Sequence, residues 1–150
     1  MIDEVDRSIL AALQRDGRVA FADVAKQVGL AASTVHARVQ RLEQTGVIRG
    51  YRAVVDPAAL GRPLCAIVGV SHGPETSCDA LEAAASELPE VEDCLCVTGD
   101  PDHILKVRAR DPSDLHEILT TLQRKAGART RTWVVLQPSF EGRAVPTARK

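Results

Sequence analysis

The chain has 150 residues and no apolar run near the roughly 20 residues that a membrane-spanning helix needs. Its N-terminus also lacks the basic and apolar stretches of a secretion signal. Both absences argue against the integral membrane and secreted classes of protein. They predict a cytoplasmic protein with no membrane partner.

The sequence contains no HExxH pattern, no phosphate-binding loop and no nucleophile elbow. His72, His103 and His116 have no spacing that compels a metal site. We therefore predict that the protein is not an enzyme, with no catalytic residues and no cofactor. Because a fold alone does not assign chemistry, an enzyme stays open as an alternative, which turnover of a bound amino acid would reveal.

The four cysteines, Cys65, Cys78, Cys94 and Cys96, lack the paired Cys-x-x-Cys spacing of a structural zinc site. A cytoplasmic location argues against permanent disulfides. We expect reduced thiols packed in or near the core, and no bound metal. Since Cys94 and Cys96 would point the same way from a strand, a redox-sensing pair stays open as an alternative.

The net charge of −1 hides a modest asymmetry. The first 52 residues have eight basic and six acidic side chains, whereas the remainder has eleven basic and fourteen acidic ones. Binding to nucleic acid is therefore expected in the first part of the chain. Because the surplus is small, a dimer with two DNA-binding units is the simplest route to useful affinity.

Apolar residues recur at helical spacing in three stretches of this first part, which Asp16-Gly17 and Gly29 separate. Each stretch would bury one stripe in a shared core. Gly29 allows a tight turn before the third stretch. Two helices joined by such a turn are typical of a helix-turn-helix. The predicted helices cover residues 3–15, 22–28 and 32–45.

The third stretch has short polar groups and cations on the faces turned away from the core. A DNA major groove admits such a helix, with hydroxyls and arginines placed for phosphates or base edges. Residues 47–55 then alternate enough to predict a strand, which gives a winged helix-turn-helix. The alternative is an ordinary helical bundle whose arginines only solvate the surface. The predicted DNA-binding residues are Ser33, Thr34, His36, Ala37, Arg38 and Arg41.

The rest of the chain reads strand, helix, strand, strand, helix, strand, which is the ferredoxin-like βαββαβ order. The predicted fold class is therefore α+β. The strands are expected at residues 64–71, 91–97, 104–110 and 130–136, and the helices at 77–88 and 112–125. The expected domains are a helix-turn-helix at 1–52, a linker strand at 53–63, and an effector-binding and oligomerisation domain at 64–150.

The first and last of these strands are apolar on both sides, yet two helices cover only one face of a sheet. The uncovered face would meet water as an apolar patch, and such patches usually mark an interface. We predict that two sheets stack face to face in a symmetric homodimer. The alternative is a monomer whose own helices or C-terminal segment cover both faces.

The segment joining the two central strands, Val97–His103, combines a glycine with two carboxylates. Its backbone N–H groups could bind the carboxylate of an amino acid, and its aspartates could accept the ammonium group. The alternative is an ordinary tight hairpin in which the aspartates stabilise the turn and the histidine is a solvated strand residue. The predicted effector-binding residues are Gly99, Asp100, Pro101, Asp102, His103, Thr130 and Thr132.

Three ordered motifs resemble the Lrp/AsnC, or feast/famine, family of transcriptional regulators. They are the opening IDEVDRSILAALQRDGRVAFADVAKQVGL, the recognition segment with its RLEQTGVIRGY continuation, and VTGDPDHIL. The resemblance covers nearly the whole chain. It implies a ferredoxin-like body of the RAM type that dimerises, further assembly into tetramers or octamers, and an effector bound at the hairpin loop between dimers. The chain departs from the family pattern at Ala31, where serine is usual, and at Pro101, where an aromatic residue is favoured.

The predicted function is a sequence-specific transcriptional regulator that binds double-stranded DNA and responds to a small-molecule effector. An amino acid is the expected effector, acting through changes in assembly or DNA binding. Two alternatives keep the DNA binding. One is a thiol- or metal-responsive sensor that uses Cys94 and Cys96 with His103, and the other is an architectural DNA protein without an effector.

Overall fold

The computed structural model describes residues 2–73 and 77–147, and the chain divides into two compact units. The N-terminal unit comprises residues 1–54 together with 140–150, and the C-terminal unit comprises residues 55–139. Grouping of the last residues with the N-terminal unit differs from the expected domain at 64–150. Hydrogen bonds tie this segment to α1: the Gln14 side chain donates to the Val145 carbonyl at 3.0 Å and accepts from the Val145 amide at 2.7 Å. None of the described helices is long and apolar enough to cross a membrane.

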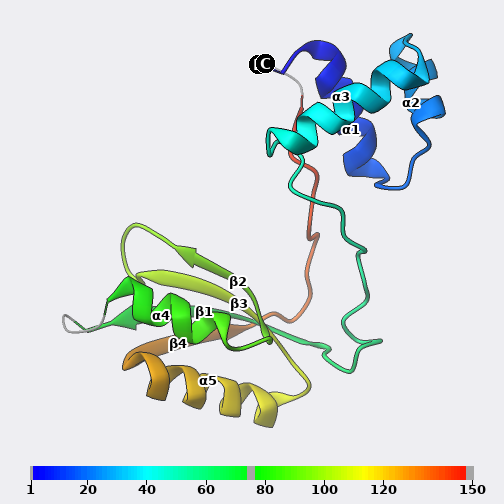
Figure 1. Ribbon diagram of the computed structural model, residues 1–150. Helices are drawn as coiled ribbons and strands as arrows, with labels where there is room; N and C mark the ends of the chain where they lie inside the picture. The colour runs from blue at the N-terminus through cyan, green and yellow to red at the C-terminus, as the bar shows by residue number, and fades with distance from the viewer. Residues whose placement is uncertain (1, 74–76, 148–150) are drawn as a thin grey trace. The chain divides into compact units, whose positions relative to one another are not determined.

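Three helices form the N-terminal unit (Figure 1). Their apolar stripes meet in one core that includes Ile9, Val24 and Val35, as the helical spacing predicted. Gly29 has a φ of 69°, and this left-handed conformation makes the tight turn of the helix-turn-helix. The helices are α1 (Glu4–Arg15), α2 (Phe21–Val28) and α3 (Ala32–Gln44).

The predicted wing is wrong, because residues 47–55 form no strand in the described part of the chain. The same holds for the linker strand expected at 53–63, where residues 57–61 form turns instead. A strand needs a neighbouring strand to exchange backbone hydrogen bonds. The described residues of the N-terminal unit include no strand that could do so. The alternating pattern therefore indicated an extended backbone but not its pairing.

Four antiparallel strands form the sheet of the C-terminal unit in the order β2-β3-β1-β4. The order of elements along the chain matches the predicted βαββαβ pattern, with β4 starting two residues earlier than expected. Figure 1 shows both helices on one face of this sheet. The elements are β1 (Leu64–His72), α4 (Cys78–Ser86), β2 (Val91–Cys96), β3 (His103–Ala109), α5 (Pro112–Ala126) and β4 (Ala128–Val134).

Side chains alternate between the two faces of the sheet. On the helix face, Val68 and Leu105 pack with Leu122 of α5 in a fully buried core. On the other face, which we call the open face, Ile67 lies beside Trp133 in the register. The side chain of Trp133 is 48% exposed there, so this face is partly apolar and accessible.

Candidate functional site

Helix α3 presents four of the six predicted DNA-binding residues to solvent, and the described residues of the unit form no hydrogen bond with these four side chains. Ser33, Thr34 and Ala37 are exposed, and the exposed His36 ring lies edge-on to Phe21 of α2 with the ring centres 5.6 Å apart. Ala31 occupies the N-cap position and supplies no side-chain hydrogen bond. The first N–H groups of α3 can therefore meet a phosphate, which the positive end of a helix favours.

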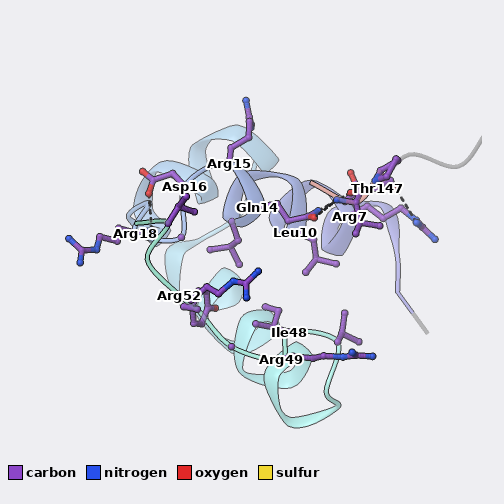
Figure 2. Close-up of a pocket in the computed structure, with 18 of the residues that line it drawn as sticks. Arg7, Leu10, Gln14, Arg15, Asp16, Arg18, Ile48, Arg49, Arg52 and Thr147 are labelled. Atoms are coloured by element: carbon purple, nitrogen blue, oxygen red, sulfur yellow. Dashed lines mark hydrogen bonds between the residues drawn. The ribbon is translucent and has the colours of Figure 1, made fainter. Parts of the chain in front are cut away.

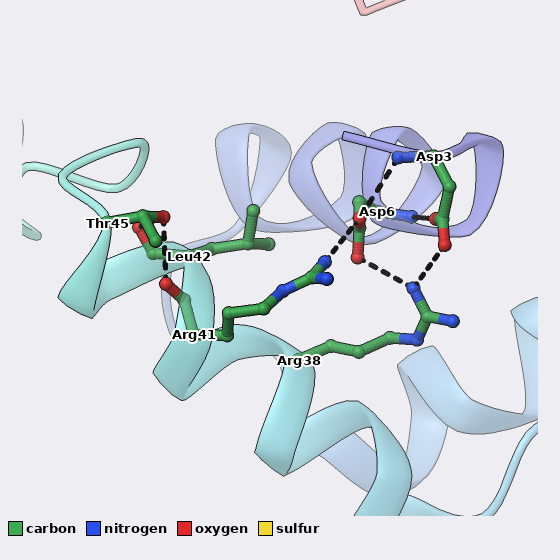
Figure 3. A network of polar contacts seen from close by, with 6 residues as sticks. All are labelled: Asp3, Asp6, Arg38, Arg41, Leu42 and Thr45. Atoms are coloured by element: carbon green, nitrogen blue, oxygen red, sulfur yellow. Dashed lines mark hydrogen bonds and ion pairs between the residues drawn. The ribbon is translucent and has the colours of Figure 1, made fainter. Parts of the chain in front are cut away.

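The other two predicted residues, Arg38 and Arg41, are held by the first turn of α1 (Figure 3). Arg38 Nη1 donates to Asp3 Oδ2 at 2.6 Å and to Asp6 Oδ1 at 2.9 Å. Arg41 Nη2 donates to Asp6 Oδ2 at 2.5 Å. The two aspartates also form a reciprocal capping box at the start of α1. We call these four residues the acidic clamp; it fixes α3 against α1.

The clamp contains a carboxylate, that of Asp6, which is 0% exposed. Burial by itself would raise the pKa of Asp6, but the Asp3 amide and the two guanidinium groups together bring it below its ordinary value. The amide of Asp6, followed by the Arg38 side chain, lowers the pKa of Asp3 to about 2. Both carboxylates are therefore ionised at neutral pH.

We expect the N-terminal unit to lose stability as the pH falls from about 4 to about 2. A carboxylate whose folded pKa is depressed stabilises the fold above its unfolded pKa, roughly 3.9 for aspartate, and loses this effect as the pH falls through the folded value. For Asp3 that value is about 2. Denaturation midpoints measured across this range should fall less steeply for Asp3→Asn than for the unaltered chain. Equal slopes would contradict the assignment.

A cleft of about 880 Å³ lies in the N-terminal unit between α1, residues 47–54 and residues 145–147 (Figure 2). Arg7 Nη1 donates to the Thr147 carbonyl at 2.9 Å and so helps to hold the C-terminal segment in place. Five arginines and the carboxylate of Asp16 line the cleft, and this excess of cations favours phosphates nearby. The sequence did not indicate this cleft, because its residues are far apart in the chain, and the basic surplus was the only related signal. The arginines lining the cleft are Arg7, Arg15, Arg18, Arg49 and Arg52.

The loop between β2 and β3 folds over the open face of the sheet. The Val97 amide donates to the Asp102 carbonyl at 2.9 Å and closes the hairpin. Ser71 Oγ lies 3.1 Å from Asp100 Oδ1, to which it donates. A Cβ atom added at Gly69 would lie 2.8 Å from Pro101 Cγ, so the loop sits on β1 where only glycine leaves room.

Three of the predicted effector-binding residues lie on the helix face instead. Gln123 of α5 donates to Thr130 Oγ1 at 2.6 Å, and Thr132 shares this face because it is two residues further along β4. His103 is 0% exposed, which contradicts the alternative interpretation of it as a solvated strand residue. Within one chain the sheet separates these three residues from Asp100 and Pro101. The alternation along each strand predicted which residues share a face of the sheet. It did not predict over which face the loop folds.

A cluster of two cysteines and one histidine lies on the helix face at the end of β2 and the start of β3. One ligand atom from each of Cys78, Cys96 and His103 lies within 4.8 Å of the others. His103 Nε2 is also 3.6 Å from Glu82 Oε1. Desolvation, and then the negative neighbours Cys96, Asp102 and Glu82, raise the pKa of Cys78.

The cysteines differ in placement from the expectation that all would pack in or near the core. Cys65 is buried, whereas Cys78, Cys94 and Cys96 are exposed, and none of the four forms a disulfide. The sequence suggested Cys94 and Cys96 with His103 as the alternative thiol or metal site, but not Cys78. Cys78 lies in the first turn of α4, far along the chain from Cys96 and His103, so no spacing pattern in the sequence linked it to them.

Comparison with known proteins places both units in one family. Residues 2–43 match the AsnC-type helix-turn-helix domain, and residues 65–145 match the Lrp/AsnC ligand-binding domain. The chain is 40% identical over 140 residues to the leucine-responsive regulatory protein of Haemophilus influenzae, covering 91% of this chain and 84% of that one.

Solved structures with the same fold include two that contain an amino acid. One is a feast or famine regulatory protein from Mycobacterium tuberculosis complexed with L-methionine, with 32% identity, a TM-score of 0.92, and coverage of 97% of this chain and 99% of that one. The other is a transcriptional regulator from Neisseria meningitidis in complex with L-Met, with 29% identity, a TM-score of 0.85 and 94% coverage of both chains. The matched domains, the exposed recognition helix and the overall fold agree, and the chain belongs to the Lrp/AsnC family of effector-responsive transcriptional regulators.

Proposed function

We propose that this regulator reads a specific DNA site through α3 and that an amino acid changes its assembly or its DNA binding. The observation that carries the DNA part is the exposed and side-chain-uncapped start of α3, where Ser33, Thr34 and Ala37 face solvent. Hydroxyls and backbone N–H groups at this position suit phosphates and base edges. Arg38 and Arg41, on the same helix, are partly exposed while Asp3 and Asp6 hold them by ion pairs.

Titration of DNA from the region upstream of the protein's own gene tests the proposal. Binding should saturate, outcompete bulk DNA and weaken as salt rises, because bound phosphates release counterions. The titration is repeated with a panel of amino acids, and one of them should shift the curve. Equal binding to all sequences would favour an architectural protein, and no binding at low salt would reject α3 as a recognition helix.

Ala37→Glu should weaken specific DNA binding by about 10- to 100-fold. The position is exposed on α3, and a carboxylate there would repel phosphates and displace a groove contact, at about 1–3 kcal/mol. Fluorescence anisotropy with labelled DNA measures the change. Ala83→Glu makes the same substitution at an exposed position of α4 and should leave the affinity unchanged. Equal affinity in both variants would remove Ala37 from the interface.

The amino-acid part of the proposal is supported by the two methionine-bound relatives and by the loop at residues 97–102. Asp100 and Asp102 supply carboxylates that an ammonium group can pair with. Because Thr130 and Thr132 lie behind the sheet, we propose that the loop is completed by residues of another copy of the chain rather than by these threonines. Ligand binding would then be linked to assembly, since only the assembled state has the complete site.

The open face of the sheet supports a homodimer. Ile67 and Trp133 lie side by side there, and the exposed Leu95 extends the apolar surface. The helix face is already filled by α4 and α5, so the open face is the surface available for a second copy. A dimer also carries two recognition helices, which raises the affinity for a two-fold symmetric DNA site.

Ile67→Asp should raise the dissociation constant of the dimer at least about tenfold, because it would bury a charge without a partner in the interface. Analytical ultracentrifugation over a concentration series measures this. Thr120→Asp, on the exposed surface of α5, is the matched control and should sediment like the unaltered chain. A dimer that withstands Ile67→Asp would place the interface elsewhere.

A further inference from the structure

We propose that Cys78, Cys96 and His103 form a binding site for one Zn²⁺ ion per chain. This site is separate from the proposed DNA and amino-acid sites, and it draws on three elements. Cys78 is the first residue of α4, Cys96 ends β2 and His103 begins β3. Cys96 and His103 are direct partners in the register of the two strands, so the hairpin brings these two ligands together before α4 supplies the third.

The geometry suits zinc. Tetrahedral zinc has bonds of about 2.3 Å to sulfur and about 2.0 Å to nitrogen, so its ligand atoms lie about 3.3–3.8 Å apart. The three ligand atoms of the cluster already lie within 4.8 Å of one another. Closing the remaining gap of about 1 Å requires a small movement of the Cys78 or Cys96 side chain, and both are exposed. The buried imidazole of His103 supplies the fixed point.

The chemistry of the ligand set also suits zinc rather than a hard cation. Two thiolates with one imidazole are soft and borderline ligands, which select Zn²⁺ over Mg²⁺ or Ca²⁺. The carboxylate of Glu82, 3.6 Å from His103 Nε2, is near enough to become the fourth ligand or to hold the imidazole in place. Binding of the dication would displace the thiol protons and offset the charge of the two thiolates so formed.

A bound ion would join the start of α4 to the base of the β2–β3 hairpin. The loop at residues 97–102 directly follows Cys96 and directly precedes His103. Zinc would therefore hold both ends of the loop that we propose as part of the amino-acid site. Binding of zinc itself requires neither DNA nor an amino acid, so it can be tested independently of both.

The test uses the full chain, reduced under anaerobic conditions, stripped of metal and titrated with Zn²⁺ against a chromophoric chelator. We expect one ion per chain. Co²⁺ in place of Zn²⁺ should give the visible absorption of a tetrahedral ion and a thiolate charge-transfer band. Cys78→Ser should weaken zinc binding by at least about 100-fold, since loss of an outer partner alone weakens metal sites by about 10- to 100-fold.

Cys94→Ser is the matched control. Cys94 is exposed on the same face of β2, two residues before Cys96, but lies outside the cluster, and its replacement should leave the affinity unchanged. Because His103 is buried, its replacement also perturbs packing. The variant His103→Gln is therefore used only to test, by the Co²⁺ spectrum, whether His103 is a ligand. Three results would each overturn the proposal. The first is an equal loss of zinc affinity in Cys94→Ser, and the second is a stoichiometry other than one ion per chain. The third is a reduced chain that binds no zinc and only forms a Cys78–Cys96 disulfide when an oxidant is added.

Discussion

Replacing Arg38 and Arg41 together with methionine should lower the free energy of unfolding of the N-terminal unit by about 3 kcal/mol. The two guanidinium groups are the cations that face the fully buried carboxylate of Asp6. Without these cations the buried carboxylate of Asp6 keeps the hydrogen bond that the Asp3 amide donates to it. This loss of stability is at the lower end of the range for breaking a buried ion pair, because about half of the Arg41 side chain is exposed and screened by water.

Hydrogen exchange of the α1 and α3 amides measures this effect within the full chain, because it reports the stability of one unit separately from the other. Methionine keeps the helix propensity and the aliphatic bulk of arginine. The double variant Arg15→Met/Arg18→Met changes the charge of the same unit equally at exposed positions and should leave exchange almost unaltered. Adding Asp6→Asn to the clamp variant should restore part of the stability, since it removes the stranded charge.

The clamp changes how a loss of DNA binding in an arginine variant is interpreted. A variant such as Arg38→Ala removes a candidate phosphate contact and one of the two cations that hold Asp6. Reduced DNA affinity could then follow from a loosened α3. Unaltered hydrogen exchange in the double methionine variant would contradict the role of the clamp and would leave both arginines available for DNA.

Gly69→Ala should destabilise the C-terminal unit by about 1–3 kcal/mol and abolish its response to the amino acid. Alanine ordinarily suits a strand better than glycine does, so a stabilising effect would be expected from propensity alone. Here the added Cβ would lie 2.8 Å from Pro101 Cγ and 3.3 Å from Trp133 Cζ3. Since the proline ring cannot rotate away as a flexible side chain would, the loop itself must lift from the sheet.

Two measurements separate these consequences. Thermal unfolding followed by Trp133 fluorescence reports stability, because the indole lies next to the altered position. Isothermal titration with the responding amino acid reports the loop. Gly73→Ala adds a Cβ that has nothing within 4 Å and should change neither. Normal stability together with normal amino-acid binding in the Gly69→Ala protein would contradict this prediction. That result would show that the loop does not depend on its close contact with Gly69 of β1.

Periodicity in the sequence predicted the helices and the order of helices and strands along the chain, and three motifs indicated the family. A helix buries every third or fourth residue and a strand every second one, so Val5, Ile9 and Leu13 or Leu64 to Val70 carry their own structural signal. Gly29 likewise signalled its turn, because its backbone preference is local. These features follow from interactions between near neighbours in the chain.

Tertiary structure alone decided which charged and reactive groups meet. Asp3 and Asp6 were interpreted as favourable charges at a helix start, yet packing of α1 against α3 buries Asp6 and commits Arg38 and Arg41 to it. Cys78 joins Cys96 and His103 because α4 begins beside the loop end of the β2–β3 hairpin. Strand pairing decided the rest: Thr130 faces α5 while Pro101 covers the opposite face, and residues 47–55 have no strand to pair with. Such contacts join residues far apart in sequence, and their geometry is set only when the helices and strands pack.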